Sequence, residues 1–285
     1  MSSDSEAESG VPLIDPEFDT APASERKKRK ADDEIATAGA AKKAKKAQKK
    51  EKRKANRQMR AKEINEDDLD QEHGVNRAFE RMDSQLLADY TNSRTRLYGT
   101  ELSSVELEDK LIPVRCIKDS STWKQMRTQD TLPAFLKSQS ADLKPTPANP
   151  CGAPHTVIVT ASGIRAADIY RALKSGLPKQ GVKNPNVSKL FAKHMKLAEQ
   201  ATTLKKNKID FGVGTPDRLS ALLDNGALCT ANLQRIIIDV SYIDQKKRGI
   251  LDMRELHEPL LKLLLRKEFV GNDDAEDENE LFVFF

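Results

Sequence analysis

The second half of the chain alternates short apolar runs with amphipathic segments. Continuous runs rich in β-branched or aromatic residues predict buried strands at 156–161, 209–213, 235–239 and 281–285. Apolar positions that recur at three- and four-residue spacing predict helices over 165–174, 187–206, 217–225 and 248–265. Because apolar strands alternating with helices are typical of parallel sheets covered on both faces, we expect an α/β fold. Ligands of such folds gather at the carboxyl ends of the strands.

The region before these strands has helical patterns only. Over 77–97, apolar residues recur on one face of a predicted helix, and Gly99 is placed to end it. Ser103 and Glu106 have the spacing of a capping box, which predicts a short helix over 105–111. A further helix is expected over 132–137.

The first 75 residues are polar and strongly charged. Acidic residues dominate 1–25 and basic residues dominate 26–60, within a chain of 285 residues with 32% charged residues and a formal net charge of +4. Such a segment buries too little apolar surface to offset the entropy of ordering, so we expect disorder. The chain then divides into a disordered arm at 1–75, a helical extension at 76–122 and an α/β domain at 123–285.

Two basic clusters lie within the arm. Dense lysine and arginine displace counterions from a phosphate backbone and also serve as nuclear import signals; the alternative is a solvated run of charge. The bias toward lysine, without interleaved aromatic residues, indicates phosphate contacts that do not depend on base sequence. The clustered residues are Arg26, Lys27, Lys28, Arg29, Lys30, Lys42, Lys43, Lys45, Lys46, Lys49, Lys50, Lys52, Arg53 and Lys54.

Composition excludes several classes of protein. The three cysteines lie far apart, without the spacing of a zinc site, and are expected to be reduced and structural. The chain begins with an acidic, polar segment and has no run of 18 apolar residues, so neither a signal peptide nor a membrane span is expected. The four histidines are scattered and suggest no catalytic triad.

The candidate chemistry lies directly after three predicted strands. Ser162-Gly163-Ile164-Arg165 follows the first, Gly214-Thr215-Pro216-Asp217-Arg218 the second, and Asp239-Val240 ends the third. Their order and spacing resemble the first RecA-like domain of DEAD-box RNA helicases, over roughly residues 123–285. The resemblance implies a single, degenerate RecA-like parallel-sheet domain.

In the DEAD-box family, a Thr-Pro-Gly-Arg motif sets a helix N-terminus against RNA phosphates, which suits an anion. The resemblance therefore implies RNA contacts by Thr215 and Arg218, and by Arg165 if one residue is inserted in its motif. Asp217 stands where the family has glycine. The alternative for this segment is a proline-initiated helix with Asp217 near its positive end.

The same resemblance argues against ATP hydrolysis. No Gly-x-x-x-x-Gly-Lys-Ser/Thr loop is present to hold phosphates. Asp239 matches the family's magnesium-associated aspartate as a vestige, but Val240 replaces the glutamate that orients water. The sequence also stops at Phe285, before the place of the family's second RecA-like domain. We expect no catalytic activity, no cofactor and no small-molecule substrate.

The chain more closely resembles a family of nucleolar proteins of the early pre-ribosomal particle that assembles the small ribosomal subunit. The resemblance rests on residues 100–109 with Ile112-Pro113, 162–168 and 214–218. It implies a nucleolar, non-catalytic scaffold that associates with pre-ribosomal RNA and with proteins of that particle. Two alternatives remain: an RNA-dependent ATPase completed by a partner, and a chromatin-associated protein whose arm binds DNA.

Overall fold

The computed structural model describes residues 66–139, 150–177, 184–192, 195–271 and 280–285. They belong to one compact unit that spans Ile64–Phe285. The remaining unit, Met1–Glu63, lies outside the described residues. The predicted disorder of the arm and the roles of its basic clusters therefore stay predictions.

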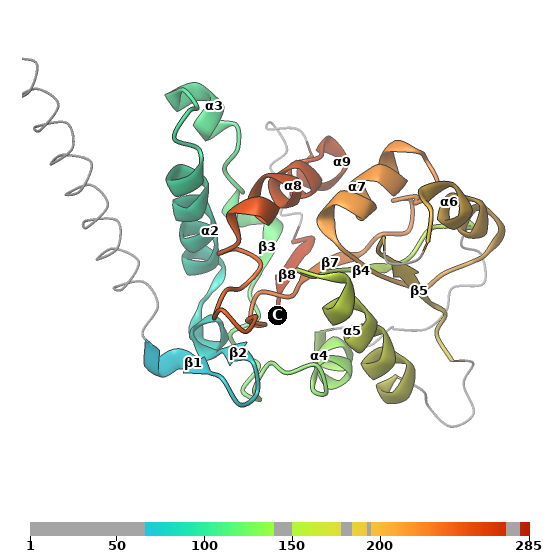
Figure 1. Cartoon of the computed structure of the whole chain (residues 1–285), viewed down its shortest axis with the longest axis horizontal. Coiled ribbons are helices and arrows are strands. Elements are labelled where there is room, and N and C mark those ends of the chain that lie inside the picture. The colour runs from blue at the N-terminus through green and yellow to red at the C-terminus, as the bar shows by residue number, and fades with distance from the viewer. Residues whose placement is uncertain (1–65, 140–149, 178–183, 193–194, 272–279) are drawn as a thin grey trace, which may run out of the picture. The chain divides into compact units, whose positions relative to one another are not determined.

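A six-stranded parallel sheet forms the centre of the unit, in the order β3-β8-β7-β4-β6-β5 (Figure 1). This confirms the predicted α/β fold with a parallel sheet. Each of the four predicted strands is present. In chain order the strands are β3 (Ile117–Lys118), β4 (Thr156–Val159), β5 (Val187–Leu190), β6 (Phe211–Gly214), β7 (Arg235–Ile238) and β8 (Phe282–Phe284).

Helices cover both faces of the sheet because successive strand residues point to opposite sides. Val157 and Val159 face a core shared with α2, α6, α7 and α8, while Ile158 faces a second core shared with α4 and α5. Figure 1 shows these two layers, with α7 and α8 on one side and α4 and α5 on the other. The bounds are α4 (Leu132–Gln139), α5 (Gly163–Gly176), α6 (Leu197–Lys206), α7 (Pro216–Asp224), α8 (Arg254–Leu264) and α9 (Lys267–Val270).

The elements before residue 119 are part of the same packed unit. Phe79, Leu87 and Ile117 lie in one core with strand residues of the sheet, and β3 pairs with β8 as an edge strand. The capping box predicted at Ser103 and Glu106 is confirmed, with both reciprocal hydrogen bonds formed. The elements are η1 (Glu66–Asp68), β1 (Leu69–Asp70), β2 (Val75–Asn76), η2 (Arg77–Arg81), α2 (Ser84–Tyr98), α3 (Ser104–Glu108) and η3 (Val114–Cys116).

A hydrogen-bonded cluster joins α2 to the loop before α8. The Asp252 carboxylate accepts a bond from the Tyr90 hydroxyl at 2.9 Å and pairs with the Arg94 guanidinium at 3.0 Å. The Tyr98 hydroxyl donates to the backbone carbonyl of Asp252 at 2.9 Å. Since Arg94 is only 3% exposed, this pair fixes α2 against the α/β core from inside the protein.

The helix predicted over 187–206 is wrong. Val187–Leu190 is a strand that pairs in parallel with β6, and only Leu197–Lys206 is helical. Val187 and Leu190 are buried while Lys189 is exposed, because β5 lies at the edge of the sheet, where part of the strand faces solvent. The apolar pattern is therefore interrupted, and the strand was missed. The helix predicted from residue 248 begins at Arg254 instead, because turns occupy the preceding residues.

Candidate nucleic-acid interface

Two helices begin at the carboxyl edge of the sheet, one over each face. β4 and β6 are neighbours, and α5 and α7 begin within a few residues of their ends. Ser162 caps α5 through a bond from the Arg165 backbone N–H at 3.2 Å. Both helices point the positive ends of their dipoles at this edge, which suits an anionic ligand.

Thr215 and Arg218 lie at the start of α7, as their motif predicts. Thr215 is the N-cap residue and is partly exposed, and its side chain makes no capping hydrogen bond. Arg218 is also partly exposed and donates from Nη1 to the Met195 carbonyl and to Gln200 Oε1, each at 3.2 Å. Pro216 opens the helix and Asp217 is an exposed acid in its first turn. A proline-initiated helix is therefore present, and Thr215 and Arg218 lie at its start, where the RNA-binding interpretation also requires them.

Arg165 has a partner that its motif does not predict. Its guanidinium binds the Asp239 carboxylate at two points, from Nε to Oδ2 at 2.8 Å and from Nη2 to Oδ1 at 3.1 Å. The two side chains are 7% and 1% exposed. Arg165 and Asp239 therefore form a buried, bidentate ion pair that joins the start of α5 to the end of β7.

Further groups enclose this pair. The Thr160 hydroxyl donates to Asp239 Oδ2 at 3.2 Å, and Arg165 Nη1 donates to Gln129 Oε1 at 3.3 Å. The guanidinium carbon also lies 4.4 Å from the centre of the Tyr242 ring. Burial lowers the pKa of Arg165, but the charge and hydrogen bonds of Asp239 outweigh this and raise it above its usual value. Arg165 therefore keeps its positive charge at every physiological pH.

A second buried arginine lies where β3 and β8 end. Arg127 is fully buried and donates from Nη1 to the Phe284 carbonyl at 2.8 Å and from Nη2 to the Ser120 carbonyl at 3.0 Å. Burial lowers the pKa of Arg127 to about 10. The protein's own cation thus binds the backbone at this end of the sheet. Nothing in the local sequence singles out this arginine, because its acceptors are backbone carbonyls.

Among the described residues, no cluster of three or more histidine, cysteine or acidic side chains has the geometry of a metal site. The three cysteines are free thiols, with Cys116 buried and Cys151 exposed. No described helix has the length and apolar character that crossing a membrane requires.

By its fold and its site, this protein is a parallel α/β domain in which Arg165 holds the aspartate that follows β7. Among solved structures, the chain is similar to the yeast DEAD-box splicing factor Prp28, with a TM-score of 0.40 and 16% sequence identity. That similarity covers 57% of this chain and 35% of the Prp28 chain.

The family itself is shown by sequence. The profile of the family described as CMS1, U3-containing 90S pre-ribosomal complex subunit, matches residues 23–285, and the chain belongs to this family. It is 48% identical to Protein CMS1 of Chaetomium thermophilum over 76% of this chain and 86% of that protein. It is 31% identical to Protein cms1 of Schizosaccharomyces pombe over 65% of each chain. It is 33% identical to human Protein CMSS1 over 38% of this chain and 37% of the human protein.

Family membership confirms the predicted place in ribosome biogenesis, as a subunit of the U3-containing 90S pre-ribosomal complex. Membership of that complex implies a nucleolar location. The roles assigned to Arg165, Thr215, Arg218 and the basic clusters stay predictions.

Proposed function

We propose that this chain is a non-catalytic, RNA-associated scaffold that binds pre-ribosomal RNA within the 90S complex. The observation that carries the proposal is the bidentate bond between Arg165 and Asp239. It leaves the strand-end carboxylate engaged inside the protein, at the position where a hydrolytic α/β enzyme needs a free acid.

The chemistry of hydrolysis supports this reading. A magnesium ion is usually held by one or two carboxylates together with substrate phosphates, but both oxygens of Asp239 accept hydrogen bonds from a guanidinium. Breaking that pair leaves a buried charge without a partner, at a cost of about 3–5 kcal/mol. Val240, the next residue, is 1% exposed and has an aliphatic side chain that cannot orient water.

Two sets of groups are proposed to bind RNA. The first is the carboxyl edge of the sheet, where α5 and α7 begin and where Thr215 and Arg218 at the start of α7 are partly exposed. The second is the lysine-rich arm, whose charge favours any phosphate backbone. In this proposal the arm supplies affinity and the edge of the folded domain sets the position on RNA.

The test is nucleotide binding and hydrolysis by the full chain, titrated to millimolar ATP with and without single-stranded RNA. We expect RNA binding without ATP turnover. A matched Asp239→Asn variant is expected to have the same turnover as the unmodified chain. Turnover that RNA stimulates, and that this variant abolishes while thermal unfolding shows it still folded, would establish the rival function, an RNA-dependent ATPase.

A chromatin role is the remaining alternative, because a lysine-rich arm also binds DNA. Nuclease treatment of sedimented complexes separates the two. The scaffold proposal requires RNase to release the chain from its complex, whereas release by DNase alone would identify a chromatin-associated protein.

A further inference from the structure

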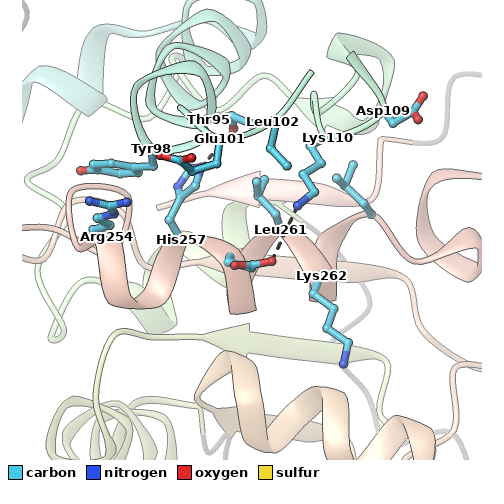
Figure 2. A pocket seen from close by; sticks show the side chains of 13 residues that line it. Thr95, Tyr98, Glu101, Leu102, Asp109, Lys110, Arg254, His257, Leu261 and Lys262 are labelled. Carbon is cyan, nitrogen blue, oxygen red and sulfur yellow. Dashed lines mark hydrogen bonds and ion pairs between the residues drawn. The ribbon is translucent and has the colours of Figure 1, made fainter. Parts of the chain in front are cut away.

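A groove runs between α8 and the segment that joins α2 to α3. It encloses about 680 Å³ and is lined by Thr95 and Tyr98 from α2 and by Leu265 from the end of α8. Figure 2 shows Leu102 and Leu261 facing each other across it, one from each wall. Leu102 and Leu265 are only partly buried, so the groove offers apolar surface that no described residue covers.

The two walls carry opposite charge. Lys110 and Glu258 pair across the groove at 3.7 Å, the dashed contact in Figure 2, and so offset each other. The charges that remain on α8 are the exposed Arg254 and Lys262. Those that remain on the opposite wall are the exposed Glu101 and Asp109. Among the described residues, these four side chains form no ion pair.

The groove continues beyond Leu265. A second cavity of about 850 Å³ shares Asp109 and Leu265 with the first and extends to Ile112 and Val270. Together they make a furrow that runs from α8 toward α9 and is larger than the 300–1,000 Å³ of a typical small-molecule pocket. Its volume and its partly exposed leucines fit a segment of polypeptide.

We propose that this furrow binds an amphipathic helix of another protein in the 90S complex. The helix would place an apolar stripe on the partly exposed Leu102 and Leu265, as helix-in-groove recognition does. Its acidic flank would face Arg254 and Lys262, and its basic flank would face Glu101 and Asp109. This inference rests on membership of the complex and does not depend on the proposed RNA scaffold role.

Charge and sequence argue against RNA and against the lysine-rich segment of the arm as occupants. RNA would bring phosphates against Glu101 and Asp109, which repel them. The segment 41–62 of the arm is almost entirely alanine, lysine, arginine and other polar residues, and it has no apolar stripe for the leucine-lined floor.

A photo-crosslinking amino acid at Leu102, in the full chain within purified 90S particles, tests the proposal. The matched control carries the same group at Leu86, which is 52% exposed near the start of α2 and does not line the groove. We expect position 102, but not position 86, to crosslink to a protein segment with apolar residues three and four apart between an acidic and a basic flank. Crosslinks at 102 to RNA or to the chain's own arm, or none from an incorporated chain, would overturn the proposal.

The proposed placement of the acidic and basic flanks is tested by measuring the affinity of the full chain for a synthetic peptide of the crosslinked sequence. Arg254→Glu with Lys262→Glu, and separately Glu101→Lys with Asp109→Lys, are each expected to weaken binding about tenfold, because each places like charges opposite one another. The control Lys205→Glu with Lys206→Glu, on α6, is expected to change binding by less than about twofold. Thermal unfolding of each variant establishes that it folds. Unchanged binding by both wall variants would refute the assignment.

Discussion

At the scale of single residues, the buried ion pair is the strongest determinant of what this domain does. Arg165→Met removes the cation and leaves Asp239 buried without a partner, so we expect a loss of about 3–5 kcal/mol of unfolding free energy. The double variant Arg165→Met with Asp239→Leu should recover much of that loss, because two apolar side chains replace the pair. Urea unfolding measures both. A loss below about 1 kcal/mol in the single variant would indicate a pair open to solvent.

Two buried histidines make stability depend on pH. Burial, with a nearby arginine in each case, lowers the pKa of His155 and of His257 to about 4 from 6.5. Between these values the unfolded chain binds protons on these histidines that the folded chain does not. Their contribution therefore lowers the unfolding free energy as pH falls from 6.5 to about 4 and is constant below. Each shift contributes at most about 3 kcal/mol.

Urea midpoints at a series of pH values across this window test the effect. His155→Gln with His257→Gln removes both titrating groups and should flatten the slope between pH 6.5 and about 4, although acid unfolding through carboxylates persists below it. An unchanged slope in this double variant would assign the pH dependence to other groups.

At the scale of elements, the predicted helical extension is expected to be inseparable from the α/β domain. Removing residues up to 122 deletes β3 and the core side chains Phe79 and Leu87, and leaves Asp252 without Arg94. We expect a chain of residues 66–285 to unfold cooperatively, and one of residues 123–285 to lack cooperative unfolding and to bind hydrophobic dyes. Circular dichroism during heating and dye fluorescence measure this. Cooperative unfolding of residues 123–285 would instead support the domain boundary after residue 122 that the sequence predicts.

Strands buried on both faces were predictable because burial favours an unbroken apolar run, as at 236–238 in β7. β5 and β3 were missed for different reasons. β5 has polar residues between its buried ends, and β3 is only two residues long. β3 pairs with β8, and just beyond these strands Ser120 donates a hydrogen bond to the carbonyl of Phe284, 164 residues further along the chain. Such pairing is a tertiary property that the local sequence pattern does not encode.

The candidate site was predictable in part. The parallel sheet placed the motifs at one edge, and the helix start at Thr215 followed from Pro216. The bond from Arg165 to Asp239, 74 residues away, required the order of the strands, which periodicity does not give. The motif around Arg165 implied an RNA contact for this side chain, and it gave no sign that the Asp239 carboxylate of the same protein would bind the guanidinium instead.

At the scale of the whole molecule, the arm and the folded edge are predicted to contribute differently to RNA binding. A lysine-rich arm acts by counterion release, so its contribution falls steeply with salt; a protein with roughly six to ten phosphate contacts loses about 10³–10⁵ in affinity between about 50 and 200 mM salt. A few contacts at the start of α7 give a shallow dependence. We therefore expect a steep salt dependence for the full chain and a shallow one for residues 66–285.

Variants on the two surfaces separate these contributions. Arg218→Glu should abolish the weak binding of residues 66–285, because it places a negative charge beside the proposed phosphate site at the helix N-terminus. In the full chain the same change should lower affinity while the slope of log affinity against log salt changes by only about one contact. Replacing the basic residues of 42–54 by glutamine should instead flatten the slope. If residues 66–285 bind no RNA and Arg218→Glu leaves the full chain unaffected, the arm alone binds RNA, and the carboxyl edge of the sheet must serve protein contacts within the particle.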